Sequence, residues 1–194
     1  MTTCIIINGH TDKDSFAEAN AEALQEAAKN QGFETKLLHV NDFPRVGCNP
    51  AKGGCPIEFN ALAKEIAAAD YLAVTAPMWN LGVPGVCKNF IDGVMQARVA
   101  FAYHRPKWWH KILGIPNLEG LLQAKKVVFV WTCGGPAWTY TILGNPMVKQ
   151  LKLMFKVYGA KKFVSLSLGS IRRDSDEQRA RTDAFIAKLK KYKF

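Results

Sequence analysis

Five short apolar runs that alternate with helical patterns constrain the fold of this chain more than any other feature. The runs carry branched and aromatic side chains and are bounded by polar residues or Gly, which is typical of strands buried on both faces. The expected strands are Cys4–Asn8, Thr35–Val40, Asp70–Thr75, Lys126–Trp131 and Lys162–Leu168. The expected helices are Phe16–Asn30, Glu58–Ala69, Lys88–Val94, Pro146–Tyr158 and Ser175–Lys191. Such alternation implies a parallel sheet with helices on both faces.

The order of these elements predicts how the chain is organised. Right-handed crossovers between five parallel strands favour the sheet order 2-1-3-4-5. We therefore expect an α/β fold, a three-layer α-β-α sandwich that residues 1–194 form as a single domain. The segment 41–56 is expected to be a loop. The connection from Tyr103 to Gly120 contains an insertion, at about 104–120, that is dense in aromatic and basic residues.

The charge of the chain limits its partners. The formal net charge is +10, from 26 Lys and Arg against 16 Asp and Glu. Such a charge fits nucleic-acid binding, or a surface that attracts anionic small molecules. We favour the second interpretation and predict no nucleic-acid partner, because no nucleic-acid motif accompanies the charge.

Apolar runs and cysteines indicate the compartment. No apolar run reaches the roughly 18 residues of a membrane span, and no basic segment precedes the first apolar run as in a signal peptide. The five cysteines are Cys4, Cys48, Cys55, Cys87 and Cys133. Their number is odd and no pair has the C-x-x-C spacing, so neither a disulfide framework nor a metal site is predicted. Cys48 and Cys55 are expected to be plain thiols, and the protein is expected in the cytoplasm.

The loop after the first strand, Asn8–Phe16, leads directly into a helix. A helix N-terminus presents unpaired N–H groups and a positive dipole end, so it suits a phosphate. Thr11 and Ser15 can add hydroxyl donors, and His10 can add a ring N–H. The motifs G-x-x-x-x-G-K-[ST] and G-x-G-x-x-G are absent from the chain, which disfavours an NTPase or a dinucleotide Rossmann site. The alternative is that Ser15 or Asp14 simply caps the helix.

Two further loops follow the third and fourth strands. In the first of these, Trp79 can flank a planar ring, or it can belong to an apolar turn packed inside the protein. In the second, Gly134 and Gly135 let the backbone approach a ligand closely. Because ligands bind at the carboxyl ends of the strands in open α/β sheets, the three loops together predict a site for a planar, phosphorylated ligand.

These residues carry a resemblance. The chain resembles the flavodoxin-like NAD(P)H:quinone oxidoreductases and FMN-dependent azoreductases. The matching pieces are GHTDKDSF after the first strand, AADYLAVTAPMWN leading into PxxxKNFID, the run VAFAY, and TCGGPAWTY. The resemblance implies the flavodoxin-like fold and FMN as cofactor, with FAD as the alternative flavin and NAD(P)H as co-substrate. The flavin-binding residues that it implies are His10, Thr11, Ser15, Phe16, Pro77, Met78, Trp79, Asn80, Leu81, Thr132, Cys133, Gly134 and Gly135.

The function that this resemblance implies is hydride transfer from NAD(P)H through FMN to a quinone, azo or nitro acceptor. Relatives of this kind are usually homodimers with the active site at the subunit interface. Tyr140 matches a tyrosine of the quinone reductases and is the candidate catalytic residue. Trp79, Phe101, Trp138 and Tyr140 are expected to form an apolar slot, with a place in the core as the alternative for each. The insertion at 104–120 is expected to shape the acceptor pocket beside the slot.

Two alternatives stay open. The first is a flavodoxin-type electron carrier, although such carriers are usually acidic and a charge of +10 fits them poorly. The second is a membrane-associated regulatory flavoprotein. Trp108, Trp109 and the neighbouring Arg and Lys residues are types that settle at lipid headgroups, so a membrane surface is an alternative partner.

Overall fold

The computed structural model describes residues 1–45, 57–171 and 175–194. Its main feature is a five-stranded parallel sheet of order β2-β1-β3-β6-β7. The strands are β1 (Thr3–Asn8), β2 (Glu34–His39), β3 (Tyr71–Pro77), β6 (Lys126–Thr132) and β7 (Phe163–Leu168). Because β6 and β7 are the fourth and fifth strands of this sheet in chain order, the predicted order 2-1-3-4-5 and the flavodoxin-like α/β fold are confirmed.

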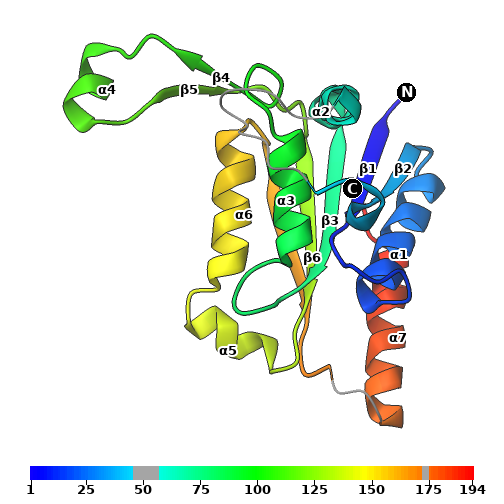
Figure 1. The fold of residues 1–194 in the computed structure, drawn as a ribbon. Helices are drawn as coiled ribbons and strands as arrows, with labels where there is room; N and C mark the ends of the chain where they lie inside the picture. The colour runs from blue at the N-terminus through cyan, green and yellow to red at the C-terminus, as the bar shows by residue number, and fades with distance from the viewer. Residues whose placement is uncertain (46–56, 172–174) are drawn as a thin grey trace.

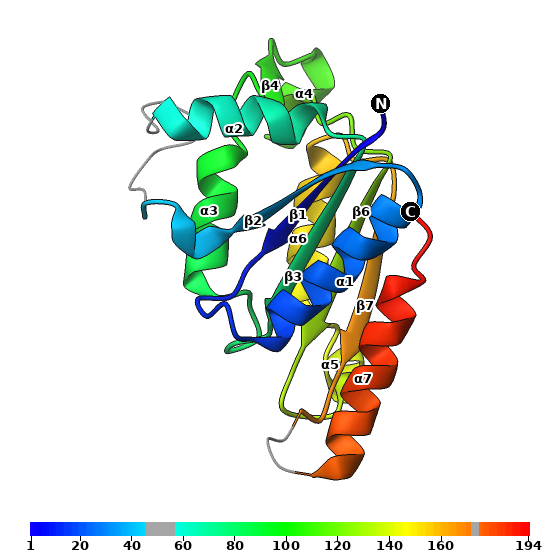
Figure 2. The same ribbon diagram turned by 90° about the vertical axis from the view of Figure 1, so that its right-hand side faces the viewer.

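Helices cover both faces of the sheet (Figures 1 and 2). The five long helices are α1 (Phe16–Asn30), α2 (Ile57–Ala68), α3 (Gly85–Val94), α6 (Pro146–Val157) and α7 (Asp176–Lys190). Alternate side chains of each strand point to opposite faces. In β1, Ile5 and Ile7 therefore pack with α2, α3 and α6, whereas Cys4 and Ile6 pack with α1 and α7. Both faces of the central strands are buried, which explains their continuous apolar sequences.

Helix α1 shows how local sequence sets the boundaries of an element. Its N-cap is Ser15, whose hydroxyl accepts a hydrogen bond from the Glu18 N–H. Its buried face carries small and apolar side chains at helical spacing, including Ala21, Leu24 and Ala28. Gly32 follows the end of the helix with a φ of +78°, a left-handed conformation that glycine adopts without a steric cost. This boundary fixes where the first turn of α1 lies relative to β1.

The predicted boundaries differ from the structure at functional loops. Helix α3 begins at Gly85 rather than Lys88, and β3 runs to Pro77 rather than Thr75. The expected loop 41–56 begins with a 3-10 helix, η1 (Val40–Asp42). The rest of that loop from residue 46, with Cys48 and Cys55, lies outside the described residues. A short helix that the sequence did not suggest, α5 (Ala137–Ile142), follows the Gly134–Gly135 segment.

The long connection after α3 folds as an arm, residues 101–120. It consists of two antiparallel strands, β4 (Phe101–His104) and β5 (Asn117–Gly120), with a short helix, α4 (Trp108–Leu113), between them. Helix α3 returns the chain from the carboxyl ends of the strands to their amino ends, so the arm starts there. It projects from the end of the sheet opposite to α5 (Figure 1). Within one chain the arm therefore does not lie beside the carboxyl ends of the strands, and the expectation that the insertion shapes the acceptor pocket stays a prediction.

Candidate functional site

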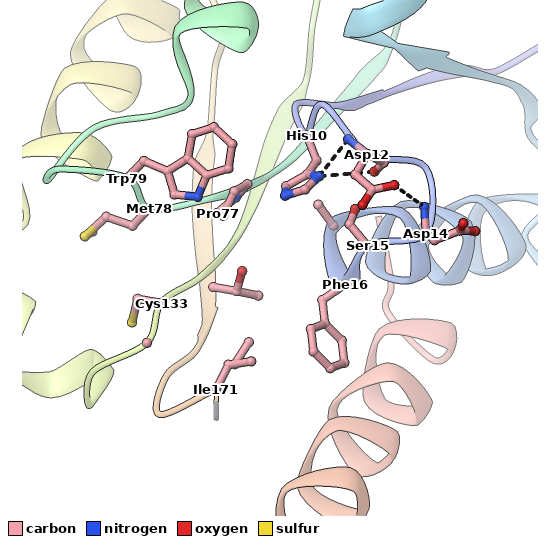
Figure 3. Close-up of a pocket in the computed structure, with 13 residues that line it drawn as sticks. His10, Asp12, Asp14, Ser15, Phe16, Pro77, Met78, Trp79, Cys133 and Ile171 are labelled. Carbon is pink, nitrogen blue, oxygen red and sulfur yellow. Dashed lines mark hydrogen bonds between the residues drawn. The ribbon is translucent and has the colours of Figure 1, made fainter. Parts of the chain in front are cut away.

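A cavity of about 370 Å³ lies at the carboxyl ends of β1, β3 and β6, which are neighbours in the sheet. This is the place where open α/β sheets bind ligands, and the volume lies within the range of small-molecule sites. The residues that line the cavity are His10, Asp12, Asp14, Ser15, Phe16, Ala17, Pro77, Met78, Trp79, Thr132, Cys133, Gly134 and Ile171 (Figure 3). The three loops singled out in the sequence thus meet around one cavity.

The first wall is the loop between β1 and α1. Gly9 lies so close to β3 and α3 that an added Cβ would be 2.6 Å from the Cys87 Sγ and 3.0 Å from the Thr75 oxygen. The Gly9 N–H donates to that same oxygen at 2.7 Å. The loop then folds on itself, because the Asp12 N–H donates to Nδ1 of His10 at 2.8 Å. Close approach at Gly9 therefore anchors the loop and leaves the N-terminus of α1 facing the cavity.

The second wall is a tight turn after β3. The N–H and C=O groups of Trp79 and Gly82 bond to each other in both directions, each at 2.9 Å. Asn80 and Leu81 between them have φ values of 48° and 65°, as a two-residue type I′ turn requires. A leucine in this conformation is unusual and marks a constrained segment. The turn holds the Trp79 ring edge-on to His10, with 5.5 Å between ring centroids.

The third wall is the segment after β6. An added Cβ at Gly134 would meet no atom within 4 Å, so this backbone borders open space. The loop after β7 holds this segment through backbone hydrogen bonds. The Ser170 N–H donates to the Gly135 oxygen at 2.7 Å, and the Ile171 N–H donates to the Cys133 oxygen at 3.1 Å. Burial raises the pKa of the Cys133 thiol, against a smaller lowering by the Ser170 N–H, so this side chain is a neutral thiol at pH 7.

Most of the predicted flavin-binding residues line the cavity. They are His10, Ser15, Phe16, Pro77, Met78, Trp79, Thr132, Cys133 and Gly134. Thr11, Asn80, Leu81 and Gly135 lie in the same loops but outside the lining. The structure adds Asp12, Asp14, Ala17 and Ile171, which the sequence did not assign to the flavin site. Ile171 was missed because the loop after the fifth strand was not considered, although that strand also ends at this edge.

The expected aromatic slot does not form within one chain. Phe101 is buried in β4, at the amino ends of the strands, where it stacks on Tyr158 with 5.0 Å between ring centroids. Trp138 is exposed on α5. Tyr140 packs edge-on against Trp131, at 6.2 Å between centroids, and does not line the cavity. Placing Phe101 in the slot was wrong, because α3 carries the chain away from the site before this residue.

Metal-ligand clusters and membrane-spanning helices are both absent from the described residues. Within residues 1–45, 57–171 and 175–194, no cluster of three or more His, Cys, Asp or Glu side chains is arranged to hold a metal ion. In the same part of the chain, no helix is both long enough and apolar enough to cross a membrane.

Comparison with known proteins places the chain in a family. A family model described as the flavodoxin-like fold matches residues 2–192. The FMN-dependent NADH:quinone oxidoreductase of Leptothrix cholodnii is 40% identical over 76 residues, which are 39% of this chain and only about a third (32%) of the relative. The enzyme of the same name from Metamycoplasma arthritidis is 29% identical over 164 residues, 82% of this chain and 78% of the relative.

A solved structure extends the similarity to the whole fold. The NAD(P)H:quinone oxidoreductase from Methanothermobacter marburgensis superimposes with a TM-score of 0.76 at 16% identity, over 98% of each chain. At that identity the superposition shows the fold and no more. Since the family model spans almost the entire sequence, the chain belongs to the family of proteins with the flavodoxin-like fold.

Proposed function

We propose that the cavity binds FMN, and that this protein is a cytoplasmic oxidoreductase that passes hydride from NAD(P)H through FMN to a quinone. The observation that carries the proposal is the meeting of a helix N-terminus, an aromatic turn and an open glycine around one cavity. The names of both curated relatives support it, since each is an FMN-dependent NADH:quinone oxidoreductase. Azo and nitro compounds are further acceptors that the sequence resemblance suggests, and FAD is the alternative flavin.

The N-terminus of α1 suits the phosphate of FMN. Phe16 and Ala17, the first residues of the helix, line the cavity, and their N–H groups belong to the unpaired donors of a first helical turn. The positive end of the helix dipole lies at the same place. Ser15 offers its hydroxyl hydrogen there, because its oxygen already accepts the Glu18 N–H. One Asp12 carboxylate oxygen is likewise engaged, by the Asp14 N–H at 3.1 Å (Figure 3).

The opposite side of the cavity suits a flat ring. Trp79 and Met78 offer an apolar wall that limits access of water, and the Gly134 backbone lies against free space. In this proposal the Gly134 N–H donates to a polar edge of the ring, as in other sites where backbone donors stabilise charge. When bound, the flavin supplies the hydride chemistry, and the protein supplies position and electrostatics.

We also propose a homodimer in which the arm of one subunit covers the cavity of the other. The arm points away from its own cavity, so it can approach only that of a second copy. Its tip exposes apolar side chains, with Trp108 at 74% and Ile112 at 73% exposure. The arm carries Arg105, Lys107 and Lys111 but one acidic residue, Glu119, whereas the cavity lining includes Asp12 and Asp14. Apolar contact and charge complementarity both favour this arrangement.

One observation favours a second candidate function. Exposed Trp108 and Ile112 lie beside Lys107 and Lys111 on the arm, the combination that binds anionic lipid surfaces. A membrane-associated role would then replace the dimer contact. Sedimentation with vesicles that contain anionic phospholipid distinguishes the two, since an arm already covered by a second subunit does not bind lipid.

Spectroscopy and turnover test the main proposal. We expect purified protein to show flavin absorption, to release FMN on denaturation, and to oxidise NADH or NADPH when a quinone is added. Protein that holds FMN without oxidising either nucleotide would point to an electron carrier. Protein that binds neither FMN nor FAD overturns the proposed function.

A further inference from the structure

A partly buried polar cluster adjoins the loop that carries His10. It joins Asn8 at the end of β1, Glu18 in the first turn of α1, and His39 at the end of β2. Asn8 is 1% exposed, and the side chains of Glu18 and His39 are 13% and 18% exposed. A carboxylate that is largely withdrawn from water is costly unless it is paired and hydrogen-bonded, and Glu18 has both kinds of partner.

The partners form a short chain of contacts. Oε2 of Glu18 accepts a hydrogen bond from the Asn8 side-chain amide and lies 3.0 Å from Nδ1 of His39. The other end of the same amide, Oδ1 of Asn8, accepts the backbone N–H of His10 at 3.0 Å. An amide has distinct donor and acceptor ends. The end that faces Glu18 must therefore be the NH₂, and this leaves the oxygen to hold His10.

This arrangement makes the position of His10 depend on Glu18. Without the carboxylate, the Asn8 NH₂ is left with Nδ1 of His39, which lies 3.4 Å away, so the amide is held less firmly and the backbone of His10 loses a fixed partner. The loop has one other ionic tie, between Lys13 and Asp42 at 2.8 Å, but both of those side chains are exposed. Exposed pairs contribute little, so the cluster restrains this loop more than that ion pair does, in addition to the hydrogen bond of the Gly9 N–H.

We propose that Glu18 is a positioning residue for the phosphate end of the cavity. Held by His39, it sets the Asn8 amide, which in turn places His10 beside the N-terminus of α1. This inference rests on the proposed function, because it concerns the end of the site assigned to the FMN phosphate. It also explains why an acidic side chain is tolerated so close to a site for an anion: its hydrogen bonds hold it within the protein, beneath the loop.

The test compares FMN with riboflavin, which has the same ring but no phosphate, by titration of flavin-free protein. For Glu18→Ala we expect the Kd of FMN to rise about tenfold or more, since the Asn8 amide loses its shorter hydrogen bond, while the Kd of riboflavin stays within about twofold. Glu18→Gln keeps an acceptor for Asn8 and should restore most FMN affinity. Glu22→Ala removes the same charge from an exposed position one turn later in α1 and should match wild type.

The following results would overturn the positioning role of Glu18 or the phosphate site itself. Wild-type FMN affinity in Glu18→Ala, or an equal loss of FMN and riboflavin, overturns the positioning role. If Glu18→Ala does not fold, His39→Leu removes the ring that holds the carboxylate, and an unchanged ratio of FMN to riboflavin affinity in that variant also overturns it. Wild-type protein that binds FMN no better than riboflavin contradicts the phosphate site itself, and so the proposed function rather than this inference alone.

Discussion

The two ends of the sheet differ in how fully their backbone and side-chain groups find contacts within one chain. At the carboxyl ends, the three loops of the cavity are tied by backbone hydrogen bonds, such as those between Trp79 and Gly82 and between Ser170 and Gly135. At the amino ends, the arm carries exposed apolar side chains on α4, including Trp108 and Ile112. The first end is a cavity whose walls one chain holds in place by itself. The second end is an exposed apolar surface, of the kind that often marks an interaction site.

This difference shows which structural features one chain can complete by itself. A cavity at strand ends needs only backbone geometry, and residues such as Gly9 and Gly134 supply it within one chain. The exposed arm differs, because its apolar side chains become buried only when a second surface covers them. The predictions below test whether the two ends are as separate as the structure indicates.

The largest effect is expected at the base of the arm. A Cβ added to Gly120 would lie 2.2 Å from the Gly159 nitrogen and 2.3 Å from the Tyr158 carbonyl carbon. Backbone atoms cannot move aside as flexible side chains do, so Gly120→Ala should destabilise the fold by about 3 kcal/mol or more. Urea denaturation measures the loss. Gly85→Ala is the control, because a Cβ there meets no atom within 4 Å, and equal stability of the two variants would contradict the packing.

The second largest effect is expected at the cavity, on the affinity for FMN. Gly134 has free space around its missing Cβ, so Gly134→Val should fold with nearly wild-type stability. If the flavin ring fills that space, the valine side chain should raise the Kd of FMN by roughly a hundredfold, equivalent to about 2.7 kcal/mol. Fluorescence titration measures it. Full FMN occupancy in a folded Gly134→Val protein would remove this segment from the site.

Much of the carboxyl end could be predicted from sequence. Strand ends, glycines and a helix N-terminus are local signals, and they placed His10, Trp79 and Gly134 correctly around the cavity. The sheet order followed from the alternation of strands and helices. Asn80 and Leu81 lie outside the lining, in a turn with positive φ values that the sequence Trp-Asn-Leu-Gly does not reveal, and their contact with flavin stays a prediction.

The amino end could not be predicted in the same way. The insertion at 104–120 has no strong strand or helix period, and its short strands are held by pairing with each other rather than by propensity. Phe101 was assigned to the site from the resemblance alone, but its position depends on the direction of α3. Asn8, Glu18 and His39 were missed because three separate elements bring them together.

The third prediction concerns the tip of the arm. Trp108 and Ile112 are exposed, so replacing both with Glu should leave the fold and FMN affinity nearly unchanged. If a second subunit covers them, the variant should become monomeric and its KM for quinones should rise several-fold. Analytical ultracentrifugation and steady-state kinetics measure both. Trp108→Phe with Ile112→Leu keeps the apolar surface as a control. A wild-type protein that is monomeric would contradict the dimer.

The smallest effect, a change in Tm, is expected where β1 and β3 begin. The pKa of Asp70 is lowered, chiefly by its hydrogen bond with Lys125 and then by the Thr3 N–H. A carboxyl with a depressed folded-state pKa adds stability above its unfolded pKa of about 4, and that stability is lost as the pH falls through the folded value. Asp70→Asn should therefore lower Tm slightly at pH 7 and less at pH 3. A larger deficit at pH 3 would contradict this assignment.

Thermal unfolding with and without FMN tests the central claim most directly. A ligand that binds only the folded state at a hundredfold excess over its Kd stabilises it by about 2.7 kcal/mol. For a domain of this size that corresponds to a rise in Tm of roughly 5–11 °C. We predict a rise of this size for flavin-free protein with FMN, and a smaller rise with riboflavin at the same concentration. No shift with FMN, and none with FAD, would contradict the flavin site.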